Sequence, residues 1–415
     1  MAARHFPVRP NLEQLRHQAK DLLRAIRGGE PAALSELEAH HPRRASPEAV
    51  KLADAQLVLA RAYGLPSWPR LVLACRMTDA IWRDDRETVR KLVGKHPRLL
   101  DEDARGVKGS WGPPMSYASN LGRREIVEML RGLGAKDLAH AFDRACLQGE
   151  IETAKRLYEL GARPAPDAFM GLAETQNVSC FDYLISLGAQ IQDAEGNRLG
   201  PAALVLETYV RHPWGKHAFL ERLAAHGFAL PDTPTMALHC GRIDLLEEHL
   251  RRDAGLLSRR FSHREIYPPE MGCHEDASLA LHGTPIAGGT LLHLCVDYDE
   301  IEIAQWLIAK GADVDAPALV DAEGWGGHTP LFGCVVSQPY RVGRRRDDAF
   351  ARLLLDRGAN PNARASIRKR LRFVPDESMH EYRDVTPLSW GERFHDRDWV
   401  SPAVMRRIVE WGGRA

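Results

Sequence analysis

The sequence predicts an all-α repeat solenoid, in which pairs of helices stack one after another along the chain. Two periodic features and the length predict it. Seven helical segments end in a Gly that follows an apolar residue by four positions, and six segments pair a large apolar residue with a small one three positions later. At 415 residues the chain is also longer than one compact core usually is. We therefore expect about eight or nine repeated units.

The Gly residues mark the predicted helix ends. Glycine adopts left-handed backbone conformations at no steric cost, so a Gly after a run of apolar positions is a common helix C-cap. The interval between Gly227 and Gly311 is long, and we expect it to hold a divergent unit near residues 236–252 and then an insertion. The glycines are Gly134, Gly161, Gly188, Gly227, Gly311, Gly358 and Gly412, and the apolar residues before them are Leu130, Leu157, Leu184, Leu223, Leu307, Leu354 and Ile408.

The paired large and small residues mark the first helix of each unit. A small side chain one helical turn beyond a large one lets stacked helices approach closely, so we expect both to be buried. The pairs are Met115 and Ala118, Phe142 and Ala145, Met170 and Ala173, Leu292 and Cys295, Leu331 and Cys334, and Leu388 and Gly391. The residues expected to face the concave side of the array are Tyr117, Arg144, Leu172, Leu294, Gly333 and Trp390.

One stretch of the chain resembles the ankyrin repeat. Thr290 and His293 open a helix pair, Gly311-Ala312-Asp313 closes it, and Thr329-Pro330-Leu331 is a further copy of the opening motif. The resemblance covers roughly residues 71–415 and implies a scaffold that leaves the identity of the ligand open. In this motif we expect His293 to bond to backbone and to the nearby threonine.

Three regions of the chain differ in character. Residues 1–70 show helical apolar periodicity with Asn11 as an N-cap, and we expect an N-terminal helical cap on the array. Residues 64–72 resemble a segment found before ankyrin arrays in bacterial proteins. We expect divergent, mostly short ankyrin-like repeats over residues 71–260, and long-fingered repeats with a C-terminal cap over residues 261–415.

Composition narrows the classes of partner. Lys plus Arg and Asp plus Glu both number 56, so no net charge favours nucleic acid or an anionic membrane. The sequence contains no signal-peptide or membrane-spanning pattern, and its seven cysteines include no Cys-x-x-Cys pair. We therefore expect a cytoplasmic protein with reduced thiols and a protein or peptide partner, with a small molecule as the alternative ligand.

Long segments place the working surface in the C-terminal part of the chain, because long loops are uncommon without a function. They are residues 261–289, 315–330, 337–348 and 364–385. Trp, Tyr and Arg are frequent interface anchors, and from them and the concave positions we select the partner-binding candidates. These are Trp325, His328, Tyr340, Arg345, Tyr382 and Trp390. The competing interpretation is that Trp325 packs one finger on the next and that the arginines near Arg345 are solvated.

An enzyme built on the same loops is the alternative function. Histidines stand beside acids in several long segments, and imidazoles with carboxylates serve as metal ligands or as general acids and bases. The alternative requires at least three of these histidines to meet in one concavity. They are His263, His274, His328, His380 and His395. No recognised catalytic motif accompanies them, so we assign no catalytic residue, metal ligand or cofactor.

Overall fold

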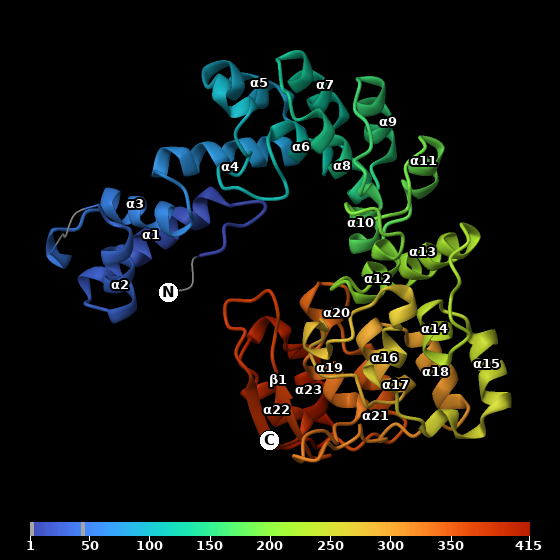
Figure 1. Ribbon diagram of the computed structural model, residues 1–415. Coiled ribbons are helices and arrows are strands. Elements are labelled where there is room, and N and C mark those ends of the chain that lie inside the picture. Colours follow the sequence, from blue (N-terminus) through green and yellow to red (C-terminus); the bar gives the residue numbers. More distant parts are fainter. Residues whose placement is uncertain (1–3, 43–45) are drawn as a thin grey trace. The chain divides into compact units, whose positions relative to one another are not determined.

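The computed structural model describes residues 4–42 and 46–415, and this part of the chain is helical apart from one two-stranded sheet (Figure 1). The chain divides into two compact units. Unit 1 comprises Met1–Ala165 and Asp182–Ala189, and unit 2 comprises Pro166–Phe181 and Gln190–Ala415. The all-α repeat fold predicted from the sequence is confirmed, whereas the predicted division at residues 70 and 260 stays a prediction.

Unit 1 contains nine helices and most of a tenth within its described residues. They are α1 (Leu12–Arg27), α2 (Pro31–His40), α3 (Leu52–Ala62), α4 (Trp68–Trp82), α5 (Arg86–Lys95), α6 (Pro114–Ser119), α7 (Arg124–Gly132), α8 (Leu138–Gln148), α9 (Ile151–Glu159) and most of α11 (Phe181–Ser186). The helices α4, α6 and α8 pack in one row, and α5, α7 and α9 pack in a second row (Figure 1). Each helix of the first row thus pairs with the helix that follows it.

Unit 2 contains the remaining helices and the sheet. They are α10 (Ala168–Thr175), α12 (Leu199–Glu207), α13 (Pro213–Ala225), α14 (Pro234–His239), α15 (Ile243–Arg252), α16 (His263–Ile266), α17 (Leu291–Tyr298), α18 (Ile301–Ala309), α19 (Pro330–Val335), α20 (Gln338–Arg341), α21 (Ala349–Leu355), β1 (Ala365–Lys369), β2 (His380–Val385), α22 (Pro387–Arg393) and α23 (Pro402–Glu410). Here α14, α17, α19 and α22 pack in sequence. The pair α14 and α15 is the divergent unit expected near residues 236–252.

In seven of the repeats, the second helix ends in the same backbone motif. All seven predicted glycines have positive φ, from 81° at Gly412 to 107° at Gly161. The amide after each Gly donates to the carbonyl of the apolar residue four positions before that Gly, as from Ala312 to Leu307 over 2.9 Å. The seven apolar residues are at most 1 % exposed. The local sequence therefore specifies both the stop of each second helix and its anchor in the core.

The first helices also follow the predicted pattern, with one exception. Five of the six large residues are buried with their small partners, whereas Met170 is half-buried and Phe169 fills the core in its place. The expected concave-face positions are mostly covered, because Tyr117, Leu172 and Leu294 are fully buried. Whether these positions form a binding face on the concave side stays a prediction.

The N-terminal helices share a core with the first repeat. Asn11 accepts a hydrogen bond from the Gln14 amide over 3.0 Å, which confirms it as the N-cap of α1. Leu15 of α1 and Leu59 of α3 belong to the same buried cluster as Leu71 of α4. Helices α1 and α3 thus pack on α4 through one apolar core, and their role as a cap of the array stays a prediction.

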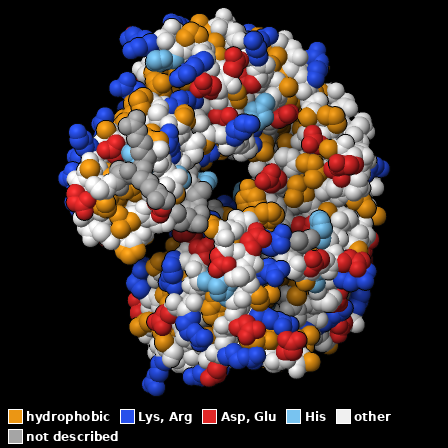
Figure 2. Space-filling view, turned by 60° about the vertical axis from the view of Figure 1, so that its left-hand side comes forward, with side chains coloured by type: hydrophobic (Ala, Val, Ile, Leu, Met, Phe, Trp, Pro, Cys, Tyr) orange, Lys and Arg blue, Asp and Glu red, His pale blue; other side chains and the backbone are white. Residues whose placement is uncertain are grey.

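Most cysteines are buried, and charges of both signs are mixed on the surface (Figure 2). Six of the seven cysteines are buried, Cys240 is half-buried, and none forms a disulfide in the described ranges. Acidic and basic side chains are interspersed over the face seen in Figure 2. No helix in the part of the chain that the structure describes is both long enough and apolar enough to span a membrane.

Three buried carboxylates follow one another at the C-terminal end of α17. Asp297 accepts from Arg211 and from His282 Nδ1, each over 2.9 Å. Glu300 lies 3.0 Å from Lys216 Nζ. No side chain of the three carboxylates is more than 6 % exposed.

The third carboxylate, Asp299, pairs with Arg345. Arg345 follows α20, Arg211 lies just before α13, and Lys216 lies in the first turn of α13. The three carboxylates at the end of α17 therefore link several repeats.

The environments of these carboxylates differ. Burial disfavours the charge of Asp297, but Arg211 and His282 outweigh it and lower the pKa of Asp297 to about 2. In Glu300, Lys216 and His217 likewise outweigh burial and lower the pKa. In Asp299, burial wins over Arg345 and raises the pKa. Of the three carboxylates, Asp297 is thus the one whose negative charge is best compensated by its neighbours.

The substitution Asp297→Asn is expected to destabilise unit 2 by about 3–5 kcal/mol, because it leaves the Arg211 guanidinium buried without a counter-charge. Urea unfolding monitored by circular dichroism measures the change. The double substitution Arg211→Met, Asp297→Leu should restore only part of the loss, because it removes both charges but leaves the carbonyls of Thr208 and Leu281 without their donor.

The matched control is Glu248→Gln, which removes a carboxylate from an exposed ion pair with Arg252 in the same unit. It should leave the unfolding curve nearly unchanged. Equal effects of Asp297→Asn and Glu248→Gln would show that the buried cluster contributes nothing special to stability.

Candidate functional site

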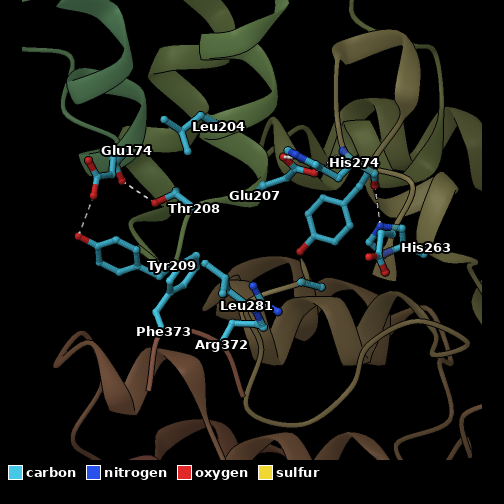
Figure 3. A pocket seen from close by; sticks show the side chains of 13 residues that line it. Glu174, Leu204, Glu207, Thr208, Tyr209, His263, His274, Leu281, Arg372 and Phe373 are labelled. Atoms are coloured by element: carbon cyan, nitrogen blue, oxygen red, sulfur yellow. Dashed lines mark hydrogen bonds and ion pairs between the residues drawn. The ribbon is translucent and has the colours of Figure 1, made fainter. Parts of the chain in front are cut away.

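A cavity of about 620 Å³ in unit 2 is the candidate site (Figure 3). Three separate parts of the chain line it: α10 with the end of α12, the insertion that begins at α16, and the loop between β1 and β2. The lining residues are Glu174, Leu204, Glu207, Thr208, Tyr209, His263, Tyr267, His274, Asp276, Ala280, Leu281, Arg372 and Phe373. Two of the four long segments predicted to carry function, residues 261–289 and 364–385, therefore meet at one cavity.

Glu207 ties the insertion to α12 on one side of the cavity. Its carboxylate accepts from the His274 amide over 2.6 Å and lies 3.0 Å from His274 Nδ1. His263, on α16, places its Nε2 2.8 Å from the His274 carbonyl oxygen. These contacts hold the insertion, residues 261–289, against α12.

Glu174 and Tyr209 form the opposite side (Figure 3). The Tyr209 hydroxyl donates to Glu174 Oε1 over 3.2 Å, and the Thr208 hydroxyl donates to the Glu174 carbonyl over 2.7 Å. Tyr209 is nevertheless 45 % exposed. This side offers an aromatic ring and a carboxylate at the same place.

The hairpin loop contributes an exposed aromatic side chain. Strands β1 and β2 pair antiparallel, with Lys369 opposite His380. In the loop, Phe373 has φ of 59° and is 81 % exposed, and its amide donates to Glu377 Oε1 over 2.7 Å. A left-handed backbone conformation is unfavourable for a residue with a side chain, so the other contacts of the loop must offset this strain at Phe373.

The cavity has aromatic and aliphatic walls with an excess of carboxylates. The carboxylates of Glu174, Glu207 and Asp276 line it, and among the described lining residues Arg372 is the one with a guanidinium or ammonium group. Arg372 lies 3.6 Å from Glu377 outside the lining, which partly satisfies its charge. Such a combination attracts a cation that has an apolar body.

Below the cavity, hydrogen bonds lead from Tyr267 to the buried carboxylate of α17. Tyr267 contacts His282 Nε2 over 2.9 Å, and His282 Nδ1 contacts Asp297. The Tyr298 hydroxyl donates to the Tyr267 oxygen. Burial raises the pKa of Tyr267 well above its usual value and lowers the pKa of His282. With its hydroxyl so engaged, Tyr267 is suited to shape the wall rather than to exchange protons with a ligand.

The structure gives Trp325 a packing role. The side chain is 5 % exposed, and the Arg383 guanidinium lies 3.8 Å from its ring centroid. The backbone of Gly326 forms a bridge with Ser366 at the start of the hairpin. This is the competing interpretation from the sequence, in which Trp325 packs one finger on the next. Its role in partner binding stays a prediction.

Tyr382 and Trp390 lie inside the molecule, 4 % and 0 % exposed. Trp390 Nε1 donates to Thr284 Oγ1 over 3.1 Å, and the Tyr382 hydroxyl lies 2.6 Å from His395 Nδ1. The two rings are in edge contact, with centroids 4.8 Å apart. Neither ring offers free surface in this structure, and the role of both residues in partner binding stays a prediction.

The remaining predicted residues are also engaged. His328 is buried, and its Nε2 lies 2.8 Å from the Pro285 carbonyl oxygen. Arg345 pairs with Asp299 instead of forming a solvated loop. Tyr340 is half-buried under the guanidinium of Arg346, 4.6 Å from its ring centroid. None of the six predicted partner residues lines the cavity.

The five histidines of the enzyme hypothesis do not meet. His263 and His274 line the cavity, His380 stacks on His395 with centroids 3.8 Å apart, and His328 faces His293. Across residues 4–42 and 46–415, no group of three or more metal-ligating side chains could hold an ion. The requirement that three of these histidines share one concavity is therefore not met.

The sequence predicted two of the three walls and, on them, only His263 and His274 among the residues singled out. The lengths of residues 261–289 and 364–385 were the signal for those walls. Phe373 lies within the long segment 364–385 but is not among the six selected residues. Nothing in the sequence from Glu207 to Tyr209 predicted a binding site, because this helix end has neither a repeat motif nor an unusually long loop.

The comparisons with known proteins concern the repeat. Residues 287–318 match the family model described as ankyrin repeat. No curated protein matches the chain. Among the solved structures, the ankyrin repeat domain of human ASB11 is similar at 18 % identity and a TM-score of 0.23, over 73 % of this chain and 99 % of that domain. The model match confirms the repeat at the place where the sequence resemblance was strongest.

Within that repeat, His293 has the role predicted for it. Its Nδ1 accepts from the Thr290 amide over 3.0 Å, and its Nε2 lies 3.0 Å from the His328 carbonyl oxygen. Burial lowers the pKa of His293 to about 3 and that of His328 to about 4. Both histidines are therefore held neutral in the folded chain.

We expect acid to destabilise unit 2 through these histidines. In the unfolded chain these two histidines bind protons below a pKa of about 6.5. In the folded chain His328 does not bind a proton until about pH 4. The free energy of unfolding therefore falls as the pH drops from 7 to 5. Replacing His328 by Asn should reduce that fall by about 1–2 kcal/mol at pH 5. Urea midpoints at pH 7 and pH 5 measure it. His17→Gln, at an exposed position, is the control, and an equal pH dependence in both variants would refute the assignment.

Proposed function

We propose that this chain, an ankyrin-repeat protein, is a recognition module that binds a partner protein at its long C-terminal fingers and seats a segment of that partner in the cavity of Figure 3. One observation carries the proposal. Two segments in excess of the repeat, residues 261–289 and 364–385, converge on one cavity instead of extending separately into solvent. Long loops that close on a common site are typical of binding surfaces.

The exposed rings support a peptide ligand. Phe373 and Tyr209 keep 81 % and 45 % of their surface open to solvent, although burying an aromatic side chain is favourable. Aromatic anchors beside a concavity are the usual centre of a protein interface. A partner that covers both rings would bury them on binding rather than on folding.

The carboxylates support a basic anchor. One carboxylate oxygen of Glu174 accepts a hydrogen bond from the Tyr209 hydroxyl, and its other oxygen can accept one from a ligand. Asp276 caps the Ser278 amide over 2.8 Å and is otherwise open to solvent. A Lys or Arg side chain suits this site, because its aliphatic stem can pack on the rings while its charge meets a carboxylate.

The same chain also supports a proposal on location. Seven cysteines without a disulfide suit a reducing compartment, and we propose that the protein works in the cytoplasm.

Selection from a random peptide library displayed on phage tests the function. The full chain is the bait, and Phe373→Ala, Glu174→Gln is the counter-selected variant. We expect enriched peptides to carry Lys or Arg next to an apolar residue, and calorimetry to show at least about tenfold weaker binding to the double variant. Affinity should fall at high salt, because the basic anchor meets exposed carboxylates.

The matched control is Trp214→Ala, which removes an aromatic ring that is 64 % exposed in the same unit but does not line the cavity. It should bind the selected peptides as the unmodified chain does. Peptides that bind the two variants equally well would place recognition elsewhere. Failure to enrich any peptide, from well-folded bait, would favour the small-molecule alternative, for which a cavity of this size is also suitable.

A further inference from the structure

The N-terminal arm, residues 4–10, is fixed to the body of unit 1 by side chains that bind its carbonyl groups. The Arg105 guanidinium donates to the carbonyl of Phe6, and the Tyr117 hydroxyl donates to the carbonyl of Val8 over 2.8 Å. Arg105 is 8 % exposed and Tyr117 is fully buried. Two buried polar side chains thus hold the arm in one conformation, and the residue after Val8 is an arginine.

The arm, the start of α1 and one side of α4 enclose a cleft of about 640 Å³. The arm ends where α1 begins, so the partial positive charge of the α1 N-terminus lies at the cleft. The charged residues that line it are Arg9, Arg16, Arg76, Arg83, Glu13 and Asp79. Four guanidinium groups therefore face two carboxylates.

The positive charges are only partly balanced. Asp79 lies between Arg9 and Arg83, at 2.9 Å and 3.0 Å from them. Arg16 and Arg76 are exposed and form no ion pair with any described residue. The chain as a whole has no net charge, so the excess of positive charge at this cleft is local. It arises because segments far apart in the sequence meet here.

Arg9 is also held from its other side. Its guanidinium lies 5.2 Å from the centroid of the Trp82 ring, and Trp82 Nε1 donates to the Tyr117 hydroxyl over 2.7 Å. The side chain that fixes the arm thus also fixes the ring beneath Arg9. The cation is in place before any ligand arrives, which lowers the entropy cost of binding.

We propose that this cleft binds a phosphate-bearing anion, with Arg16 and Arg76 as its free ligands and Arg9 as the fixed one. Guanidinium groups present paired N–H donors that match phosphate oxygens, and several of them around one cleft distinguish a phosphate from a single carboxylate. The volume leaves room for the organic group or the peptide that carries the phosphate. This site is independent of the cavity in unit 2 and of the partner proposed for it.

Calorimetry on the full chain at low ionic strength tests the site with two probes, inorganic pyrophosphate and a phosphoserine tripeptide. We expect one molecule bound per chain and at least a tenfold loss of affinity in Arg16→Ala, Arg76→Ala. Both substitutions lie on exposed helix positions, so the fold should survive, which circular dichroism checks. Tighter binding of the tripeptide would assign the site to a modified protein, and tighter binding of pyrophosphate to a small phosphorylated molecule.

The matched control is Arg86→Ala, Arg90→Ala, which removes two exposed arginines of the same unit from α5, outside the cleft. The proposal requires this variant to bind as the unmodified chain does. An equal loss in both double variants would show a general effect of charge and overturn the site. The absence of binding by either probe at low salt would overturn it as well.

Discussion

The buried carboxylates at the end of α17 are the constraint on which unit 2 depends. A carboxylate taken out of water must be paired, and an unpaired one costs several kcal/mol. Asp297, Asp299 and Glu300 follow one another closely. Asp297 and Glu300 pair with Arg211 and Lys216 near the start of α13, and Asp299 pairs with Arg345 after α20. The turn between α17 and α18 can therefore exist in this form only if α13, the insertion and the segment after α20 occupy their places around it.

The repeats and these charge pairs differ in how far the sequence could predict them. A helix end with Gly311 needs only the residues beside it, because the motif closes through a hydrogen bond from Ala312 to Leu307. Every such end could be found from the sequence. The pair of Arg211 and Asp297 joins positions 86 residues apart, and a single sequence contains no trace of that proximity. Local rules therefore predicted the repeated unit, while the cross-links that make unit 2 specific could not be predicted.

The same distinction explains the outcome at the candidate site. Segment length predicted where the chain has more residues than a repeat needs. Two of these long segments do meet at the cavity. The choice of residues within them relied on residue type, and large aromatic and guanidinium side chains stabilise cores as readily as interfaces. Trp325, Tyr382 and Trp390 fill the space between the fingers, whereas Phe373 is exposed. Exposure depends on what packs against a residue from elsewhere in the chain, and that is a property of the fold.

The cavity and the buried charges form one continuous structure. Arg211 donates to the carbonyl of Thr208, which lines one side of the cavity, and to the carbonyl of Leu281, which lines another. From Asp297, His282 continues the hydrogen bonds to Tyr267 in the wall. Thr208, Leu281 and Tyr267 are thus only one or two hydrogen bonds from the buried charges of Arg211 and Asp297. Such support fixes the walls before a ligand binds, so the binding energy need not be spent on ordering them. Recognition would then depend on the parts left free, the exposed ring of Phe373 and the open carboxylates, while the buried cluster determines the shape that they complete.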